Sequence, residues 1–278
     1  MFCDVALAER IERAEAQLVA EAGAAAHRRE EDTAGFVIPV AGGVASFAEA
    51  GSPFNKVAGL GFAGIPGAAA LDEIEVAFAA RGAPVQVELA HLADPAIGAL
   101  LTGRGYRLAS FENVLGLALT GEPGRVAPAG VEVRQIRAGE FESWLDVVAE
   151  GFAHPDTSGV PAHEEFPREV IARAERDDTG MTRYVALLDG VIAGGARLRT
   201  AEGIAQLTGA ATAPAHRRRG VQTALLSARL ADAAAAGCDI AVVTTQPGSK
   251  SQRNVQRQGF DLLYTRAVLV KQPRAAPR

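Results

Sequence analysis

The stretch APAHRRRGVQTALL, residues 213–226, carries the densest positive charge in the chain. His216 and three arginines precede Gly220, and an apolar run follows. Small and apolar residues then recur at three- and four-residue spacings as far as Gly237, which predicts a helix that starts near Gly220. The segment 203–212 before the stretch is expected to be a strand. The arginines therefore lie at a strand-to-helix junction.

Composition limits what this junction can do. The chain has 278 residues, 48% of them hydrophobic, with a net charge of −5 and a pI of about 5.6. That length suits two domains, each large enough for its own core. Nucleic acid and anionic membranes normally require a basic face, so an acidic chain argues against both as partners.

The sequence also indicates a cytoplasmic protein, and it shows no pattern of a metal site. It lacks a signal-peptide pattern, and it has no run of about 18 uncharged apolar residues that would span a membrane. Cys3 and Cys238 are far apart and outside any CxxC motif, which fits reduced thiols. The histidines lack the spacing of metal ligands.

Two halves with the same plan flank a linker at residues 120–133, TGEPGRVAPAGVEV. The corresponding segments are 70–82, 84–90, 94–106 and 107–119 in the first half and 225–237, 238–245, 246–260 and 261–271 in the second. Gly82 matches Gly237, and the glycine-aromatic pair 105–106 matches the pair 259–260. These matches predict a duplication. The last segment, 261–271, is expected to hold a pair of strands.

Upstream of the arginines, the second half begins with two expected helices, 140–152 and 163–176. Two antiparallel strands follow within 182–200, joined by a turn at Asp189-Gly190. This order predicts a mixed α/β sheet.

The helix expected at Gly220 would present free N–H groups and about half a positive charge at its start. Glycine lets the backbone approach a ligand, and a phosphate or pyrophosphate is the natural guest. The arginines would add charge and could pair with it. The alternative is a solvated helix entry that binds nothing.

The residues TAPAHRRRGVQTALL resemble the acetyl-CoA signature of the GNAT N-acetyltransferase superfamily, whose core is Arg/Gln-x-x-Gly-x-Gly/Ala. Arg217, Gly220 and Gln222 fall on the marked positions, and Gln222 replaces a small residue there. NVQRQGF, residues 254–260, resembles the family's later Asn…Gly-Phe segment. The first-half counterpart GLGFAGIPG, residues 59–67, has no arginine or glutamine.

The resemblance therefore implies an α/β (α+β) fold with two tandem GNAT-like mixed-sheet domains. Residues 1–122 would be a degenerate copy, and residues 131–272 would bind acetyl-CoA. The pantetheine arm would lie along the end of strand 203–212, and backbone amides of 217–222 would hold the pyrophosphate. The residues expected at the cofactor are Ala210, Ala211, Thr212, Arg217, Arg218, Arg219, Gly220, Val221, Gln222 and Asn254.

The implied reaction is direct transfer of acetyl from acetyl-CoA to a primary amine of a small molecule or peptide. The strand 203–212 lacks the glutamate that many relatives use, and Val255 stands where many carry a tyrosine acid. Tyr264 is the alternative acid. The alternative bases are His154, Asp156 and His163, in a loop expected to border the acceptor, and His216.

Three questions stay open from the sequence. The missing glutamate and tyrosine also fit a CoA-binding regulatory or structural protein without chemistry. The pattern Gly59-x-Gly61-x-x-Gly64, with Glu88 after it, also satisfies a dinucleotide fingerprint, although a helix should open at those glycines. A homodimer is an open alternative to a monomer.

Overall fold

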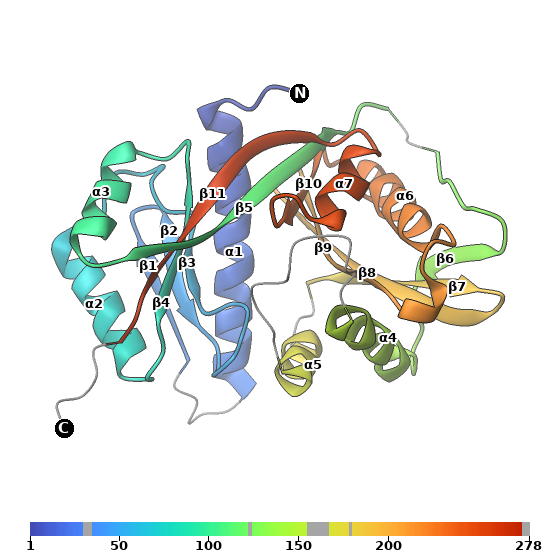
Figure 1. Ribbon diagram of the computed structural model, residues 1–278, viewed down its shortest axis with the longest axis horizontal. Coiled ribbons are helices and arrows are strands. Elements are labelled where there is room, and N and C mark those ends of the chain that lie inside the picture. Colours follow the sequence, from blue (N-terminus) through green and yellow to red (C-terminus); the bar gives the residue numbers. More distant parts are fainter. Residues whose placement is uncertain (30–34, 122–123, 155–166, 178–179, 274–278) are drawn as a thin grey trace. The chain divides into compact units, whose positions relative to one another are not determined.

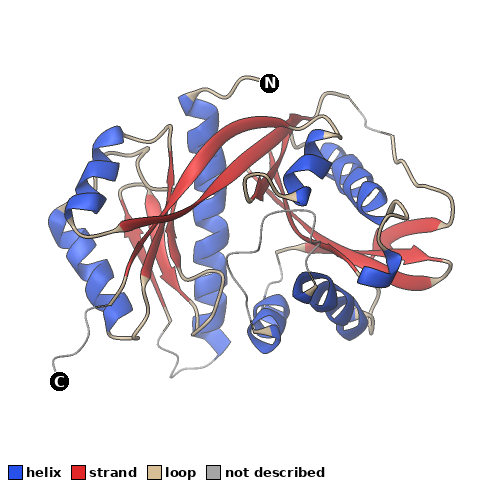
Figure 2. Ribbon diagram, viewed as in Figure 1, coloured by secondary structure: helices blue, strands red, loops and turns tan. Residues whose placement is uncertain are grey.

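The computed structural model describes residues 1–29, 35–121, 124–154, 167–177 and 180–273 (Figures 1 and 2). The chain divides into two compact units. Unit 1 consists of Met1, Leu115–Glu165 and Thr179–Leu262, and unit 2 of Phe2–Val114, Phe166–Asp178 and Leu263–Arg278.

Unit 2 is a mixed sheet with helices on both faces. Its elements are α1 (Val5–Arg29), β1 (Phe36–Val40), β2 (Gly43–Phe47), β3 (Lys56–Ala58), α2 (Ala68–Ala79), β4 (Val85–Ala90), α3 (Pro95–Gly103), α5 (Arg168–Asp177), and the larger parts of β5 (Arg107–Ala118) and β11 (Asp261–Lys271). The strand order is β1-β2-β3-β4-β11-β5. Val44 and Ala58 pack under α1, while their neighbours Ala45 and Val57 pack in the core under α2 and α3. Because side chains alternate along a strand, α1 covers one face and α2 and α3 cover the other.

Unit 1 holds the opening stretch of the sequence. Its elements are β6 (Val131–Gln135), α4 (Phe141–Ala153), β7 (Thr182–Leu188), β8 (Val191–Ala201), β9 (Ile204–Thr212), a 3₁₀ turn (Pro214–His216), α6 (Val221–Ala235), β10 (Ile240–Thr245) and α7 (Lys250–Gln256). The end of β5 joins this sheet, whose order is β5-β10-β9-β8-β7-β6. Strands β6 to β9 are antiparallel neighbours, and β9 and β10 are parallel. The mixed sheet expected from the sequence is confirmed.

Helices α4 and α6 pack on opposite faces of the unit 1 sheet. A Cβ atom on Gly194 would lie 2.7 Å from Val221 of α6, and a Cβ on the next residue, Gly195, would lie 2.6 Å from Trp144 Nε1 of α4. The Trp144 ring also donates a hydrogen bond to the carbonyl oxygen of Tyr184 on β7, at 3.0 Å. Successive residues of β8 thus face different helices, which defines an α4 face and an α6 face.

The repeat is visible in the order of elements. Helix α2, strand β4, helix α3 and strand β5 match α6, β10, α7 and β11. Gly82 and Gly237 both have positive φ angles, of 63° and 81°, where their helices end. The phenylalanine and tyrosine of the glycine-aromatic pairs make the same backbone hydrogen bond, from Tyr106 N to Leu101 O and from Phe260 N to Val255 O.

Three segments depart from the simple division at the linker. The segment 261–271, expected as two strands, is one strand, β11. Residues 263–271 of β11 belong to unit 2, and residues 115–118 of β5 belong to unit 1. Helix α5 follows the linker in sequence but belongs to unit 2. The compact units therefore differ from the ranges 1–122 and 131–272, because each half contributes residues to both.

Candidate functional site

The candidate site begins where strands β9 and β10 separate. Their parallel pairing runs from Ile204 and Ile240 to Gln206 and Val242 and does not continue. On the other side of β9, the register with β8 shifts so that Gly209 and Ala210 lie opposite the single residue Ala196. Two residues opposite one form a β-bulge, which bends a strand, and Gly209 has a φ of 56° there. The backbone groups of 207–212 are therefore not paired with those of 243–245.

Helix α6 begins directly after the end of β9 and a short turn. Gly220 is its N-cap residue, with a φ of 81° and no side-chain cap. The first amides of α6 have no acceptor inside the helix, because the backbone before Val221 is not helical. A Cβ atom at residue 220 would lie 2.6 Å from Pro128. Glycine is thus required by the left-handed backbone and by Pro128, a reason that the sequence pattern did not reveal.

The three arginines have different surroundings. Arg217 donates from Nε to Thr212 O at 3.4 Å, from Nη2 to Gly151 O at 3.2 Å, and from Nη2 to His154 O. It thereby fastens the end of β9 to the last turn of α4, whose carbonyl groups carry partial negative charge. Arg219 makes an exposed ion pair with Asp189 at 3.0 Å.

Arg218 is exposed and has a φ of 63°, a backbone conformation that costs free energy in residues other than glycine. Within the described residues, its side chain makes no hydrogen bond or ion pair. Of the three arginines, Arg217 has the role of a backbone clamp, and Arg218 and Arg219 are the ones with exposed side chains.

The departure at Gln222 has a structural explanation. Its Nε2 donates a hydrogen bond to Oγ1 of Thr212 at 3.0 Å. This contact links the first turn of α6 to the last residue of β9. The side chain therefore spans the junction that a small residue would leave open.

His154 is the candidate base that the structure connects to the junction. It follows the last residue of α4, and its backbone oxygen accepts from Arg217. Its ring Nδ1 lies 3.0 Å from Glu150 O, so Nδ1 carries the hydrogen and Nε2 is left to accept a proton. His216 lies in the 3₁₀ turn, and no described residue makes a hydrogen bond to its buried Nδ1. Asp156 and His163 lie outside the described residues.

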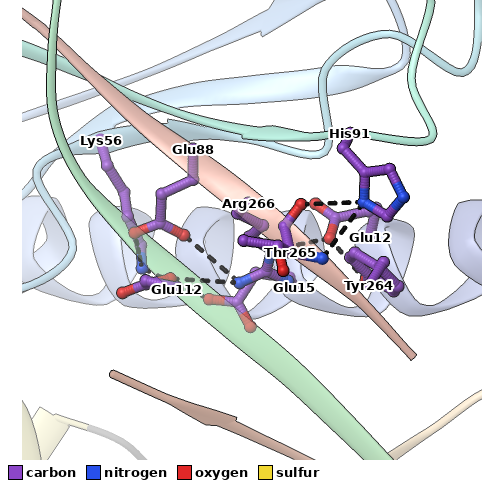
Figure 3. Close-up of polar contacts among 9 residues, drawn as sticks. All are labelled: Glu12, Glu15, Lys56, Glu88, His91, Glu112, Tyr264, Thr265 and Arg266. Carbon is purple, nitrogen blue, oxygen red and sulfur yellow. Dashed lines mark hydrogen bonds and ion pairs between the residues drawn. The ribbon is translucent and has the colours of Figure 1, made fainter. Parts of the chain in front are cut away.

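Tyr264, the candidate acid, lies in unit 2. Its side chain is 1% exposed, and its hydroxyl donates to Glu12 Oε1 at 2.6 Å (Figure 3). Burial and the nearby Glu12 carboxylate raise the pKa of Tyr264 well above its ordinary value. This environment supports a structural role, and the assignment of Tyr264 as the acid stays a prediction.

A buried charge network surrounds Tyr264, and the sequence did not reveal it. Arg266 of β11 is 1% exposed; it donates to Glu12 at 2.7 Å and lies 3.4 Å from Glu88 and 3.7 Å from Glu112 (Figure 3). Lys56 donates to Glu88 at 2.8 Å. Burial, and then repulsion from Glu88, raise the pKa of Glu112 to about 7. The sequence signal that could have indicated this network is the presence of charged residues within otherwise apolar strands.

The remaining cofactor residues lie around the strand separation. Ala210 and Ala211 are on the bulged part of β9, and Asn254 is half-buried on α7. Val255, where relatives would carry a tyrosine, is buried in the core of unit 1. Thr245, the last residue of β10, is 5% exposed, and its buried Oγ1 has no hydrogen-bond partner among the described residues. A buried hydroxyl without a partner costs about 1–3 kcal/mol, and no sequence pattern indicated it.

Packing explains two glycines of the first-half turn, Gly59 and Gly61. A Cβ on Gly59 would lie 2.8 Å from Ala16 of α1, and one on Gly61 would lie 2.6 Å from Ala93. Helix α2 opens at Ala68, not at these glycines. The turn thus lacks the strand-to-helix geometry of a dinucleotide fingerprint.

Comparison with known proteins agrees with this geometry. Residues 142–260 match the model of the acetyltransferase (GNAT) family. The second half of the chain therefore carries a GNAT acetyltransferase domain, as its motif predicted. No curated protein matches the sequence significantly.

Solved structures extend the likeness to the whole chain. A GCN5-related N-acetyltransferase from Kribbella flavida is 21% identical, with a TM-score of 0.66 over 97% of this chain and 96% of its own. A tandem GNAT protein from the clavulanic acid biosynthesis pathway is 14% identical, with a TM-score of 0.62 over 92% of this chain and 89% of its own. A GCN5-related N-acetyltransferase from Sphaerobacter thermophilus is 18% identical, with a TM-score of 0.57 over 75% of this chain and 68% of its own. The predicted tandem GNAT-like fold is confirmed.

Neither a membrane-spanning helix nor a metal-binding cluster occurs among the described residues. No helix in them is long and apolar enough to cross a membrane. They also contain no group of three or more His, Cys, Asp or Glu side chains that could hold a metal ion.

Proposed function

We propose that this protein is an N-acetyltransferase that moves an acetyl group from acetyl-CoA directly to a primary amine of a small molecule or peptide. The observation that carries the proposal is the separation of β9 from β10 immediately before the uncapped start of α6. The separated end of β9 offers unpaired backbone groups to an acyl-pantetheine arm. The start of α6 offers free amides to a pyrophosphate. Residues 142–260 match the acetyltransferase family over this same region.

The residues present fit acetyl-CoA as co-substrate. The amides after Gly220 would hold the pyrophosphate, with added charge from Arg218 and Arg219. The unpaired backbone at Gly209 and Ala210 would line the arm and could donate to the thioester oxygen. The orphaned hydroxyl of Thr245 is consistent with a polar guest at the end of β10.

His154 is the base that the contacts favour. A lysine-like amine has a pKa of about 10.4, so its deprotonation at pH 7 costs about 4.6 kcal/mol. A base that accepts this proton is therefore expected to accelerate the transfer. The His154 ring keeps Nε2 as an acceptor, and Arg217 joins its backbone to the end of β9. The alternative, a CoA-binding protein without chemistry, needs no such base.

Release of the CoA thiol in the presence of an amine panel tests the proposal. We expect turnover with at least one amine, together with an acetylated product seen by mass spectrometry. His154→Gln should lower kcat about 100-fold, within the usual range for a general base, while acetyl-CoA affinity is retained. Tight CoA binding without turnover across a broad panel would instead support the non-catalytic alternative. The cytoplasmic location, the homodimer and the ranges 1–122 and 131–272 stay predictions.

A further inference from the structure

Thr245 has a buried hydroxyl whose hydrogen bond is missing. The residue is 5% exposed, and Oγ1 has no hydrogen-bond partner in the part of the chain that the structure describes. Buried polar groups in native proteins are nearly always satisfied, so an exception points to strain, function or an absent ligand. Valine has almost the same shape and would avoid the unpaired group.

The position of Thr245 indicates which ligand could supply the bond. It ends β10, three residues after the pairing with β9 stops at Val242. Side chains alternate along a strand, so Ala241, Val243 and Thr245 share one face. Ala241 lies in the core cluster with residues of α6 and α7, and Val243 packs against that cluster. Thr245 therefore lies at the end of the strand separation, on the face that carries α6 and α7.

The proposed reaction, on which this inference rests, needs a donor there. The amine nitrogen forms a bond to the thioester carbon, and the electron pair of the breaking C–S bond goes to sulfur. The amine proton leaves to the base and then to solvent, and the sulfur finally takes a proton from solvent. Val255 cannot donate to that sulfur, because it is an apolar residue buried in the core.

We propose that the hydroxyl of Thr245, at the end of the separated strand β10, donates a hydrogen bond to the sulfur atom of CoA as the C–S bond breaks. The hydroxyl keeps its own proton and acts only as a donor. The hydrogen bond from Thr245 is stronger to the charged sulfur of the transition state than to the sulfur of the neutral thioester. Such an interaction raises kcat more than it lowers KM.

Three variants test this role. Thr245→Val should lower kcat about 10- to 100-fold, which equals about 1.4–2.8 kcal/mol in activation free energy. The KM for acetyl-CoA should change less than about threefold, and Tm should stay the same or rise because an unpaired group is removed. Thr245→Ser should recover most of kcat. Thr244→Val is the matched control, since Thr244 is exposed and points to the opposite face; it should leave kcat unchanged.

A binding comparison separates this inference from the proposed function without requiring turnover. Wild-type protein should bind CoA at least fivefold more tightly than desulfo-CoA by calorimetry, and Thr245→Val should lose that preference. Failure of wild-type protein to bind CoA contradicts the proposed function itself. CoA binding with the preference intact in Thr245→Val overturns the role of Thr245. So does a Thr245→Val variant that loses Tm and kcat together without recovery by Thr245→Ser.

Discussion

Replacing Arg217 with methionine separates a structural arginine from a phosphate-binding one. Arg217 donates to backbone oxygens of Thr212, Gly151 and His154, which belong to the end of β9 and the last turn of α4. Arg217→Met retains an unbranched apolar side chain and removes every donor. We therefore expect its main effect on the stability of unit 1.

The magnitude follows from these contacts. A hydrogen bond that involves a charged group contributes about 1.5–3 kcal/mol. Two of the bonds are long, at 3.4 and 3.2 Å, and the side chain is partly exposed, so the contributions do not simply add. We expect a loss of about 2–4 kcal/mol in the free energy of unfolding, a large part of the 5–15 kcal/mol typical of a domain.

Trp144 makes the assay specific to unit 1, because it is the one tryptophan of the sequence and is a buried residue of α4 that packs against β8. Urea unfolding followed by its fluorescence should show a lower midpoint in Arg217→Met with an unchanged slope. Arg218→Met is the matched control, because it makes the same substitution at the neighbouring arginine, whose side chain is exposed. It should change stability by less than about 0.5 kcal/mol and weaken acetyl-CoA binding about 5- to 10-fold at low salt. Arg217→Met within 0.5 kcal/mol of wild type would refute the clamp.

Three further predictions concern the junction and the charge network. Gln222→Ala should lower stability by about 1 kcal/mol through the lost bond to Thr212 and leave acetyl-CoA affinity equal or higher by calorimetry; a tenfold weaker affinity would make Gln222 a ligand residue. The pKa of Glu112 is raised in the folded state, so the native protein binds more protons than the unfolded chain between about pH 4.5 and 7, and stability should fall as pH rises through that window. Glu112→Gln should flatten this dependence and add about 1–3 kcal/mol at pH 8 in urea titrations; an unchanged pH dependence would contradict the assigned shift. Arg266→Met should destabilise unit 2 by about 3–5 kcal/mol, because Glu12 and Glu88 lose a buried counter-charge; circular dichroism melts that match wild type would exclude this role.

The fold was predictable where the sequence is periodic. Apolar spacing and Gly237 located α6, and the turn at Asp189-Gly190 located the β7–β8 hairpin. The assignment of most of β11 to unit 2 and of the end of β5 to unit 1 was not predictable, because strand order depends on long-range pairing that local patterns do not encode. From the sequence, each of the two strands is expected to be the last strand of the sheet formed by its own half.

The site was predictable at the level of backbone and not of side chains. The motif located Gly220 and the strand end, but it did not reveal that the Arg217 side chain donates to the carbonyl groups of Thr212 and Gly151. A motif specifies residue types at fixed spacing, whereas a side chain takes whichever partner the tertiary structure brings within reach. Thr245 was missed for the same reason, since its missing partner is a property of the fold.

Hydrogen–deuterium exchange with and without acetyl-CoA tests the central claim most directly, because it reports both units at once. The account predicts slower exchange in peptides that cover 207–224 and 243–256, with no change in 56–70, the corresponding turn of unit 2. Protection that is absent from 207–224, or that appears in 56–70 instead, would contradict the assignment of the acetyl-CoA site to the start of α6.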